Sequence, residues 1–88
     1  MIEKQVKIVN KLGLHARPAA LLVQKACKFQ CEITLEKEGQ TVNGKSIMGV
    51  MMLAAEQGSI LAIRAEGVDE NEAVQALIQI IESKFGEE

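Results

Sequence analysis

Residues 10–26, with the sequence NKLGLHARPAALLVQKA, contain the point at which the chain changes from strand-like to helix-like periodicity. Before them, apolar and polar residues alternate from Ile2 to Val9, a period of two that predicts a half-buried strand. After them, apolar residues recur on one helical face: Ala19, Leu22, Val23 and Ala26. Because proline suits only the first turn of a helix, Pro18 requires this helix to begin between Ala16 and Pro18.

The rest of the chain predicts three more strands and two more helices. Alternation over 31–36 predicts a strand, and a turn at 37–40 joins it to a short strand at 40–43, so that the two form an antiparallel hairpin. We expect a short helix from Ile47 to about Leu53 and a further strand from Ile60 to Glu66.

The clearest helix signal follows Asp69, which with Glu72 forms a variant of the capping box. The expected buried stripe of this helix comprises Ala73, Val74, Leu77, Ile78, Ile81 and Phe85. The element order is therefore βαββαβα, which predicts an α+β fold with a four-stranded antiparallel sheet and helices on one face. With 88 residues, the chain is expected to form one domain over residues 1–88.

Composition excludes several functions. The 10 basic and 12 acidic residues form no basic stripe, and only two residues are aromatic, which argues against nucleic-acid binding. No stretch approaches the roughly 20 apolar residues that cross a bilayer, and residues 1–4 contain no apolar signal core. We therefore expect a cytoplasmic protein that does not insert into membranes, and a small monomer is the simplest expectation.

Cys27 and Cys31 are the only cysteines. In a secreted chain they could form a disulfide, whereas in a reducing compartment they are expected to be two small buried apolar side chains. Only His15 could join them as a metal ligand, fewer than the four ligands of a typical zinc site. We therefore expect no metal.

The single histidine, His15, directly precedes the helix that begins near Pro18. The unpaired N–H groups and the dipole of a helix N-terminus favour an anion, phosphate above all, and Arg17 adds planar donors suited to phosphate oxygens. The positive helix end disfavours protonation of the imidazole, so that a ring nitrogen remains available to accept a phosphoryl group. The alternative is a solvent-exposed histidine without a role.

Ser46 precedes the short helix and suits its N-cap, which is one explanation for its presence. The other is a phosphorylation site, where phosphate would add roughly two negative charges. Because a short helix buries only one side, some of Ile47, Met48, Met51 and Met52 are expected to form an exposed partner-binding patch, although methionine stripes also occur in cores.

Together, the segments GLHARPA at 13–19 and KSIMGVM at 45–51 resemble the HPr family of bacterial phosphocarrier proteins, in length and element order as well as in both motifs. The resemblance implies an open-faced β-sandwich with three helices on one face. It implies that His15 accepts a phosphoryl group on Nδ1 from phospho-Enzyme I and passes it to an Enzyme IIA for sugar uptake, with no bound cofactor and no independent turnover. Arg17 would then orient the phosphoryl group, and partners would dock on Ala20, Ile47, Met48 and Met51.

The same resemblance makes Ser46 similar to the serine that HPr kinase/phosphorylase modifies in many Gram-positive bacteria. A protein that binds a transcriptional regulator through phosphorylated Ser46, with His15 incidental, is an alternative. Residues 10–15 also resemble NPr, the nitrogen-related branch, because Lys11 and Leu12 depart from the small polar residue common before Gly13 in the sugar branch. The regulatory paralogue Crh lacks the histidine, so that His15 argues against that identity.

Overall fold

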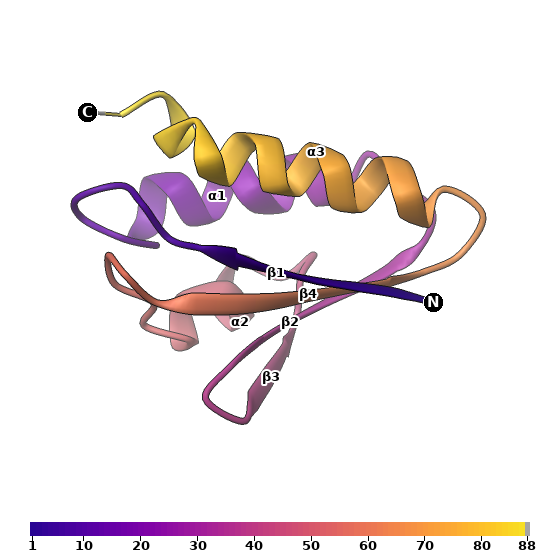
Figure 1. Ribbon diagram of the computed structural model, residues 1–88, viewed down its shortest axis with the longest axis horizontal. Coiled ribbons are helices and arrows are strands. Elements are labelled where there is room, and N and C mark those ends of the chain that lie inside the picture. The colour runs from indigo at the N-terminus through magenta and orange to yellow at the C-terminus, as the bar shows by residue number, and fades with distance from the viewer. Residues whose placement is uncertain (88) are drawn as a thin grey trace.

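The computed structural model describes residues 1–87 and contains one antiparallel sheet with three α-helices (Figure 1). The strands are β1 (Ile2–Lys7), β2 (Glu32–Lys37), β3 (Gln40–Asn43) and β4 (Ile60–Glu66). The helices are α1 (Ala16–Ala26), α2 (Ile47–Met52) and α3 (Glu70–Glu82), and a 3-10 turn, η1 (Lys84–Gly86), follows α3. The predicted order βαββαβα is confirmed.

The strands lie in the order β1-β4-β2-β3, so that β4 pairs with both β1 and β2. Val6 of β1 is opposite Leu61, Leu35 of β2 is opposite Ile63, and Leu35 also faces Val42 of β3. This register places the apolar residues of neighbouring strands on one face of the sheet, because side chains alternate between faces with a period of two.

Helices α1 and α3 lie side by side over that face, and α2 packs against α1 and β3 (Figure 1). Burying one of the large side chains contributes about 1.5–3 kcal/mol, so that the layer between sheet and helices holds the molecule together. The fully buried residues include Ile8, Leu22, Leu35, Leu61, Ile63, Leu77 and Ile81.

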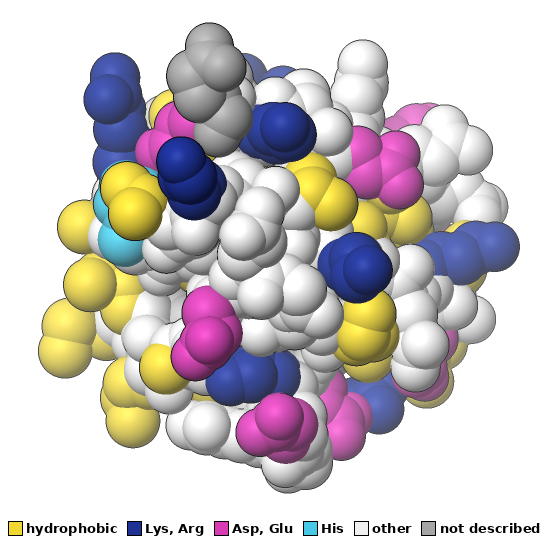
Figure 2. Space-filling model, turned by 60° about the vertical axis from the view of Figure 1, so that its left-hand side comes forward, with side chains coloured by type: hydrophobic (Ala, Val, Ile, Leu, Met, Phe, Trp, Pro, Cys, Tyr) yellow, Lys and Arg dark blue, Asp and Glu magenta, His cyan; other side chains and the backbone are white. Residues whose placement is uncertain are grey.

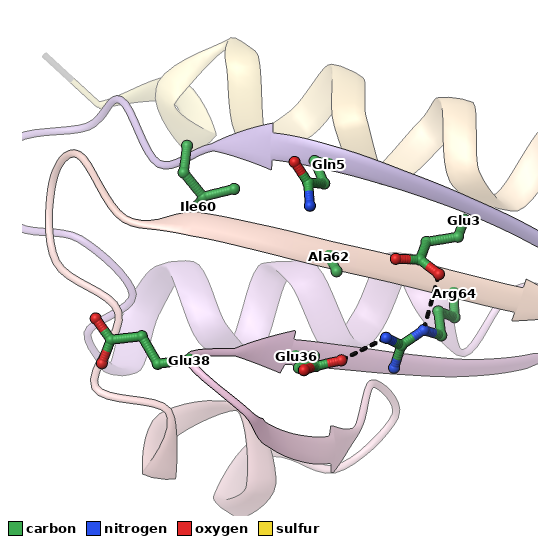
Figure 3. A pocket seen from close by; sticks show the side chains of 7 residues that line it. All are labelled: Glu3, Gln5, Glu36, Glu38, Ile60, Ala62 and Arg64. Carbon is green, nitrogen blue, oxygen red and sulfur yellow. Dashed lines mark hydrogen bonds and ion pairs between the residues drawn. The ribbon is translucent and has the colours of Figure 1, made fainter.

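Within residues 1–87 the other face of the sheet carries no helix, and Figure 3 shows polar and charged side chains on it beside Ile60 and Ala62. Arg64 of β4 donates from Nε to Glu3 of β1, at 3.1 Å, and from Nη2 to Glu36 of β2. The bond to Glu3, followed by that to Glu36, raises the pKa of the Arg64 guanidinium. These ion pairs link three adjacent strands, and the predicted open-faced sandwich is confirmed.

Asp69 is the N-cap residue of α3, as predicted, and its carbonyl oxygen accepts the N–H of Ala73 at 3.0 Å, but its side chain does not make the predicted capping-box hydrogen bond. Its carboxylate accepts hydrogen bonds from the backbone N–H groups of Gln30 (2.8 Å) and Cys31 (2.9 Å), and its side chain makes no bond to α3. Glu70, the first residue of α3, instead accepts from the N–H of Gly67 at 3.0 Å. Both carboxylates have a lowered pKa, principally because the backbone N–H of Gln30 donates to Asp69 and that of Gly67 to Glu70.

Two other expectations need correction. Both cysteines were expected to be buried, but only Cys31 is. Cys27 follows the last residue of α1, and its side chain faces solvent; both thiols are free. Phe85 is buried, but it lies in η1 with a φ of +54° and does not extend α3. No helix within residues 1–87 is long and apolar enough to cross a bilayer.

Candidate functional site

His15 is the N-cap residue of α1, as its position before Pro18 predicts. Its backbone is extended, with φ −76° and ψ −174°, and its carbonyl oxygen accepts the N–H of Ala19 at 3.0 Å. The imidazole makes no capping hydrogen bond, and 37% of the side chain is exposed. The ring is therefore accessible to another macromolecule.

The loop before His15 is held against the segment that follows α2. Gly13 has a φ of +71°, and a Cβ at this position would lie 2.4 Å from the carbonyl oxygen of Ala55. The N–H of Leu14 donates to that same oxygen at 2.8 Å. Only glycine combines this backbone conformation with so close an approach, so that Gly13 fixes the path of the chain into α1.

Arg17 lies in the first turn of α1, and its side chain is exposed. Within residues 1–87 its guanidinium makes no hydrogen bond or ion pair, and no acidic residue occurs in that first turn. The N–H groups of Ala16 and Arg17 also have no acceptor in this part of the chain, as expected at a helix start. The start of α1 therefore presents a permanent cation and two backbone donors.

The structure adds two residues that the sequence did not single out, Asn10 and Glu87. Nε2 of His15 lies 3.1 Å from Oε2 of Glu87, and Nδ2 of Asn10 donates to Oε1 of Glu87 at 3.0 Å. Asn10 is fully buried. Asn10 lies two residues after Ile8 and four after Val6, so that the period of two of the first strand already predicts that its side chain points into the core. No local pattern in the sequence distinguishes Glu87.

Ser46 is the N-cap of α2, as predicted: its Oγ accepts the N–H of Gly49 at 3.1 Å. Its carbonyl oxygen accepts the N–H of Val50 at 2.9 Å. The side chain is only half-buried, so that Oγ lies at the edge of the solvent.

The exposed apolar side chains of α2 form what we call the α2 surface: Ile47, Met48, Met51 and Met52. Val50 alone of this helix is buried, as the expectation of a one-sided short helix requires. Ala20, on the neighbouring α1, is half-buried. Figure 2 shows hydrophobic side chains gathered on the side of the molecule where the single histidine reaches the surface. Met52, one of the candidates for the exposed patch, is exposed although the resemblance did not imply it as a docking residue, and the exposed Leu12 was not predicted at all.

Among residues 1–87 there is no group of three His, Cys, Asp or Glu side chains placed to hold a metal ion.

The fold and the site define a class: a small α+β protein that presents one accessible histidine at a helix start and an exposed apolar helix. Comparisons with known proteins identify the family. The family model described as "PTS HPr component phosphorylation site" matches residues 2–83.

Two curated relatives match along nearly their whole length. The phosphocarrier protein HPr of Xylella fastidiosa is 51% identical, over 100% of this chain and 99% of the relative. The HPr-like protein Crh of Halalkalibacterium halodurans is 55% identical, over 96% of this chain and 100% of the relative.

Solved structures agree with these relatives. The crystal structure of HPr-C-His from Thermoanaerobacter tengcongensis has a TM-score of 0.96 and 57% identity, covering 100% of this chain and 99% of the other. An HPr dimer from the same organism has a TM-score of 0.80 and 56% identity, covering 99% and 100%. The chain belongs to the HPr family, the phosphocarrier proteins of the phosphotransferase system, which are not independent catalysts.

Proposed function

We propose that His15 accepts a phosphoryl group from phospho-Enzyme I and passes it to an Enzyme IIA for sugar uptake. The observation that supports this most directly is the accessible imidazole of His15 at the start of α1, followed by Arg17 without a partner among residues 1–87. A phosphoryl group on the ring would meet the guanidinium and the free N–H groups of the first turn. Both favour a dianion at a helix N-terminus.

The α2 surface supports the docking of Enzyme I and Enzyme IIA. Met48 and Met51 are exposed, by 73% and 41%, and flexible apolar side chains of this kind adapt to several partners. Because α2 packs against α1, Ala20 and Ile47 would extend the contact between the two helices. A partner bound there would cover apolar side chains that otherwise face water.

Ser46 is proposed as a regulatory phosphorylation site for HPr kinase/phosphorylase. Its half-buried Oγ lies directly before exposed Ile47 and Met48, so that a phosphate would add about two negative charges at the edge of the α2 surface. The charge must be desolvated when a partner covers this surface, which weakens docking of Enzyme I.

The proposal is tested by incubating the chain with Enzyme I, phosphoenolpyruvate and magnesium. We expect one acid-labile phosphate on the wild type and on a Ser46→Ala control, and none on His15→Ala. Circular dichroism spectra of the three proteins would establish that they are equally folded. Label on His15→Ala would contradict the assignment.

A second function is favoured by the 55% identity to the HPr-like protein Crh. In this alternative the chain acts as a regulatory interaction protein, and phosphorylated Ser46 controls its binding to a transcriptional regulator. Binding that requires phosphorylated Ser46, together with no labelling by Enzyme I, would support it. Labelling of His15 in the first experiment would favour the carrier.

The remaining proposals concern the domain organisation, cellular location, oligomeric state and pathway branch of the protein. Residues 1–88 would form one domain that works in the cytoplasm as a monomer, without a cofactor. Light scattering tests the monomer against a dimer such as that described for the Thermoanaerobacter tengcongensis protein. Transfer of labelled phosphate to a nitrogen-related Enzyme IIA in preference to a sugar-specific one would place the chain in the NPr branch.

A further inference from the structure

We propose that Glu87 is a positioning residue for His15 and that Asn10 acts through it; this inference rests on the proposed role of His15 as phosphoryl acceptor. The segment that directly follows α3 and the loop before α1 lie at the same end of the molecule (Figure 1). There, one carboxylate joins two side chains more than 70 residues away in sequence: Oε2 lies 3.1 Å from Nε2 of His15, and Oε1 lies 3.0 Å from Nδ2 of Asn10.

This contact determines where the imidazole holds its proton. An ionised carboxylate only accepts hydrogen bonds, so that the bond between Glu87 and His15 requires the proton on Nε2. In a neutral imidazole one nitrogen carries the proton and the other the lone pair. The lone pair is therefore on Nδ1, which has no hydrogen-bond partner among residues 1–87.

Asn10 holds the carboxylate in place. Its Nδ2 donates both to Glu87 and to the carbonyl oxygen of Gly13, at 2.8 Å, and thus ties the C-terminal turn to the loop before α1. If the amide were turned over, its oxygen would face two other acceptors, so that these partners fix its orientation. The Glu87 side chain is only 21% exposed, which restricts its freedom to leave the ring.

The same contact stabilises the charge that transfer creates. The Nδ1 lone pair forms a bond to phosphorus while the N–P bond of the phosphohistidine donor breaks, and the electron pair of that bond remains on the donor's ring nitrogen. The His15 ring keeps its Nε2 proton and becomes cationic. Glu87 then stabilises the cation through the Nε2–H bond, as the aspartate of a Ser-His-Asp triad does for its histidine. Onward transfer reverses these steps.

The test combines nitrogen-15 NMR of the His15 ring with single-turnover phosphorylation by phospho-Enzyme I. The variants are Glu87→Ala, Glu87→Gln and, as a matched control, Glu82→Gln, since Glu82 is exposed at the end of α3. Glu87→Gln keeps an acceptor for Nε2–H without the charge, and its similar shape protects the fold.

For the wild type and for Glu82→Gln we expect a hydrogen-bonded Nε2 proton in the NMR spectrum and equal transfer rates. In Glu87→Ala this proton should exchange rapidly with water, and transfer should slow about three- to tenfold, with unchanged affinity for Enzyme I. Glu87→Gln should keep the Nε2–H form and still slow transfer, because the neutral amide stabilises the cation less.

The experiment distinguishes failure of the proposed role of Glu87 from failure of the proposed phosphocarrier function. A wild type that takes phosphate, with Glu87→Ala showing the same Nε2 proton and the same rate, overturns the role of Glu87 alone. A wild type that takes no phosphate overturns the proposed function and this role with it.

Discussion

The backbone N–H of Leu14 donates to the carbonyl oxygen of Ala55, at 2.8 Å, and thereby joins the loop that carries His15 to the segment that follows α2. The two sequence motifs, 31 residues apart at His15 and Ser46, are thus parts of one local structure. The path of this loop depends on Gly13, whose φ is +71°.

Gly13→Ala should lower the free energy of unfolding by about 1–3 kcal/mol or more, because the strain of a positive φ is combined with a Cβ only 2.4 Å from the Ala55 oxygen. Urea denaturation measures the loss. Gly39→Ala is the matched control, since Gly39 has a φ of +84° but no atom within 4 Å of the added Cβ. Equal losses in both variants would show that the close approach contributes nothing.

Arg17→Ala should slow phosphorylation of His15 by about tenfold or more, because a charge-assisted hydrogen bond to the phosphoryl group contributes about 1.5–3 kcal/mol. Arg17→Lys should lie between this variant and the wild type, since it keeps the charge and loses the planar pair of donors. Rapid-quench transfer from phospho-Enzyme I measures both rates. Lys28→Ala, which removes another exposed cation near the far end of α1, should transfer at the wild-type rate.

Ser46 offers a test in which stability and docking change separately. Ser46→Ala should lower the free energy of unfolding by about 0.5–2 kcal/mol, through loss of the bond to the Gly49 N–H, and leave Enzyme I binding unchanged. Ser46→Asp keeps a capping acceptor and should retain stability while binding Enzyme I more weakly. Isothermal titration and thermal melts read the two effects. Unchanged transfer by authentic phosphoserine-46 protein would refute a regulatory charge at this position.

Met48→Glu should weaken binding to Enzyme I about tenfold, because it places a charge at the most exposed side chain of the α2 surface. Val68→Glu is a suitable control: Val68 is 87% exposed but lies in the loop before α3. Both side chains face solvent, so neither change should affect the melting temperature. If the two variants bind Enzyme I equally well, docking occurs elsewhere.

Stability should decrease in acid partly through Asp69. Because the N–H of Gln30, and after it Cys31, hold the pKa of Asp69 below its usual value, the folded pKa is lower than the unfolded one. Its contribution is therefore fully present above the unfolded pKa, near 3.9, and is lost as the pH falls through the folded pKa. Asp69→Asn should lower the melting temperature by several degrees at pH 7 and flatten its decrease in acid.

The control for this prediction is Glu66→Gln, since the Glu66 side chain is exposed and makes no hydrogen bond or ion pair within residues 1–87. Parallel melting curves for wild type and Asp69→Asn across the acid range would show that the two backbone donors do not stabilise the carboxylate. Asp69 also affects the neighbouring Cys31 thiol, whose pKa is raised first by burial and then by the hydrogen bond to the Asp69 carboxylate.

Much of the fold could be predicted because its signals are local. The period of two in β1 and β4, the helical spacing after Pro18 and the Ser46 cap each depend on neighbours in sequence, and each is confirmed. The capping box of α3 was predicted wrongly for the complementary reason: Asp69 is the N-cap residue, but its carboxylate accepts the N–H groups of Gln30 and Cys31 across the fold and none from α3.

The sequence by itself determined the order of the elements, the buried faces and the presence of His15 and Arg17 at one helix start, because periodicity and the limits on proline act over a few residues. Only the tertiary structure decided that Glu87 meets His15 and that Asn10 holds this carboxylate. Such contacts depend on the pairing of β1 with β4 and on the packing of α3 against both strands, which place the segment after α3 beside the loop before α1. No local pattern encodes a distance between residues so far apart in sequence.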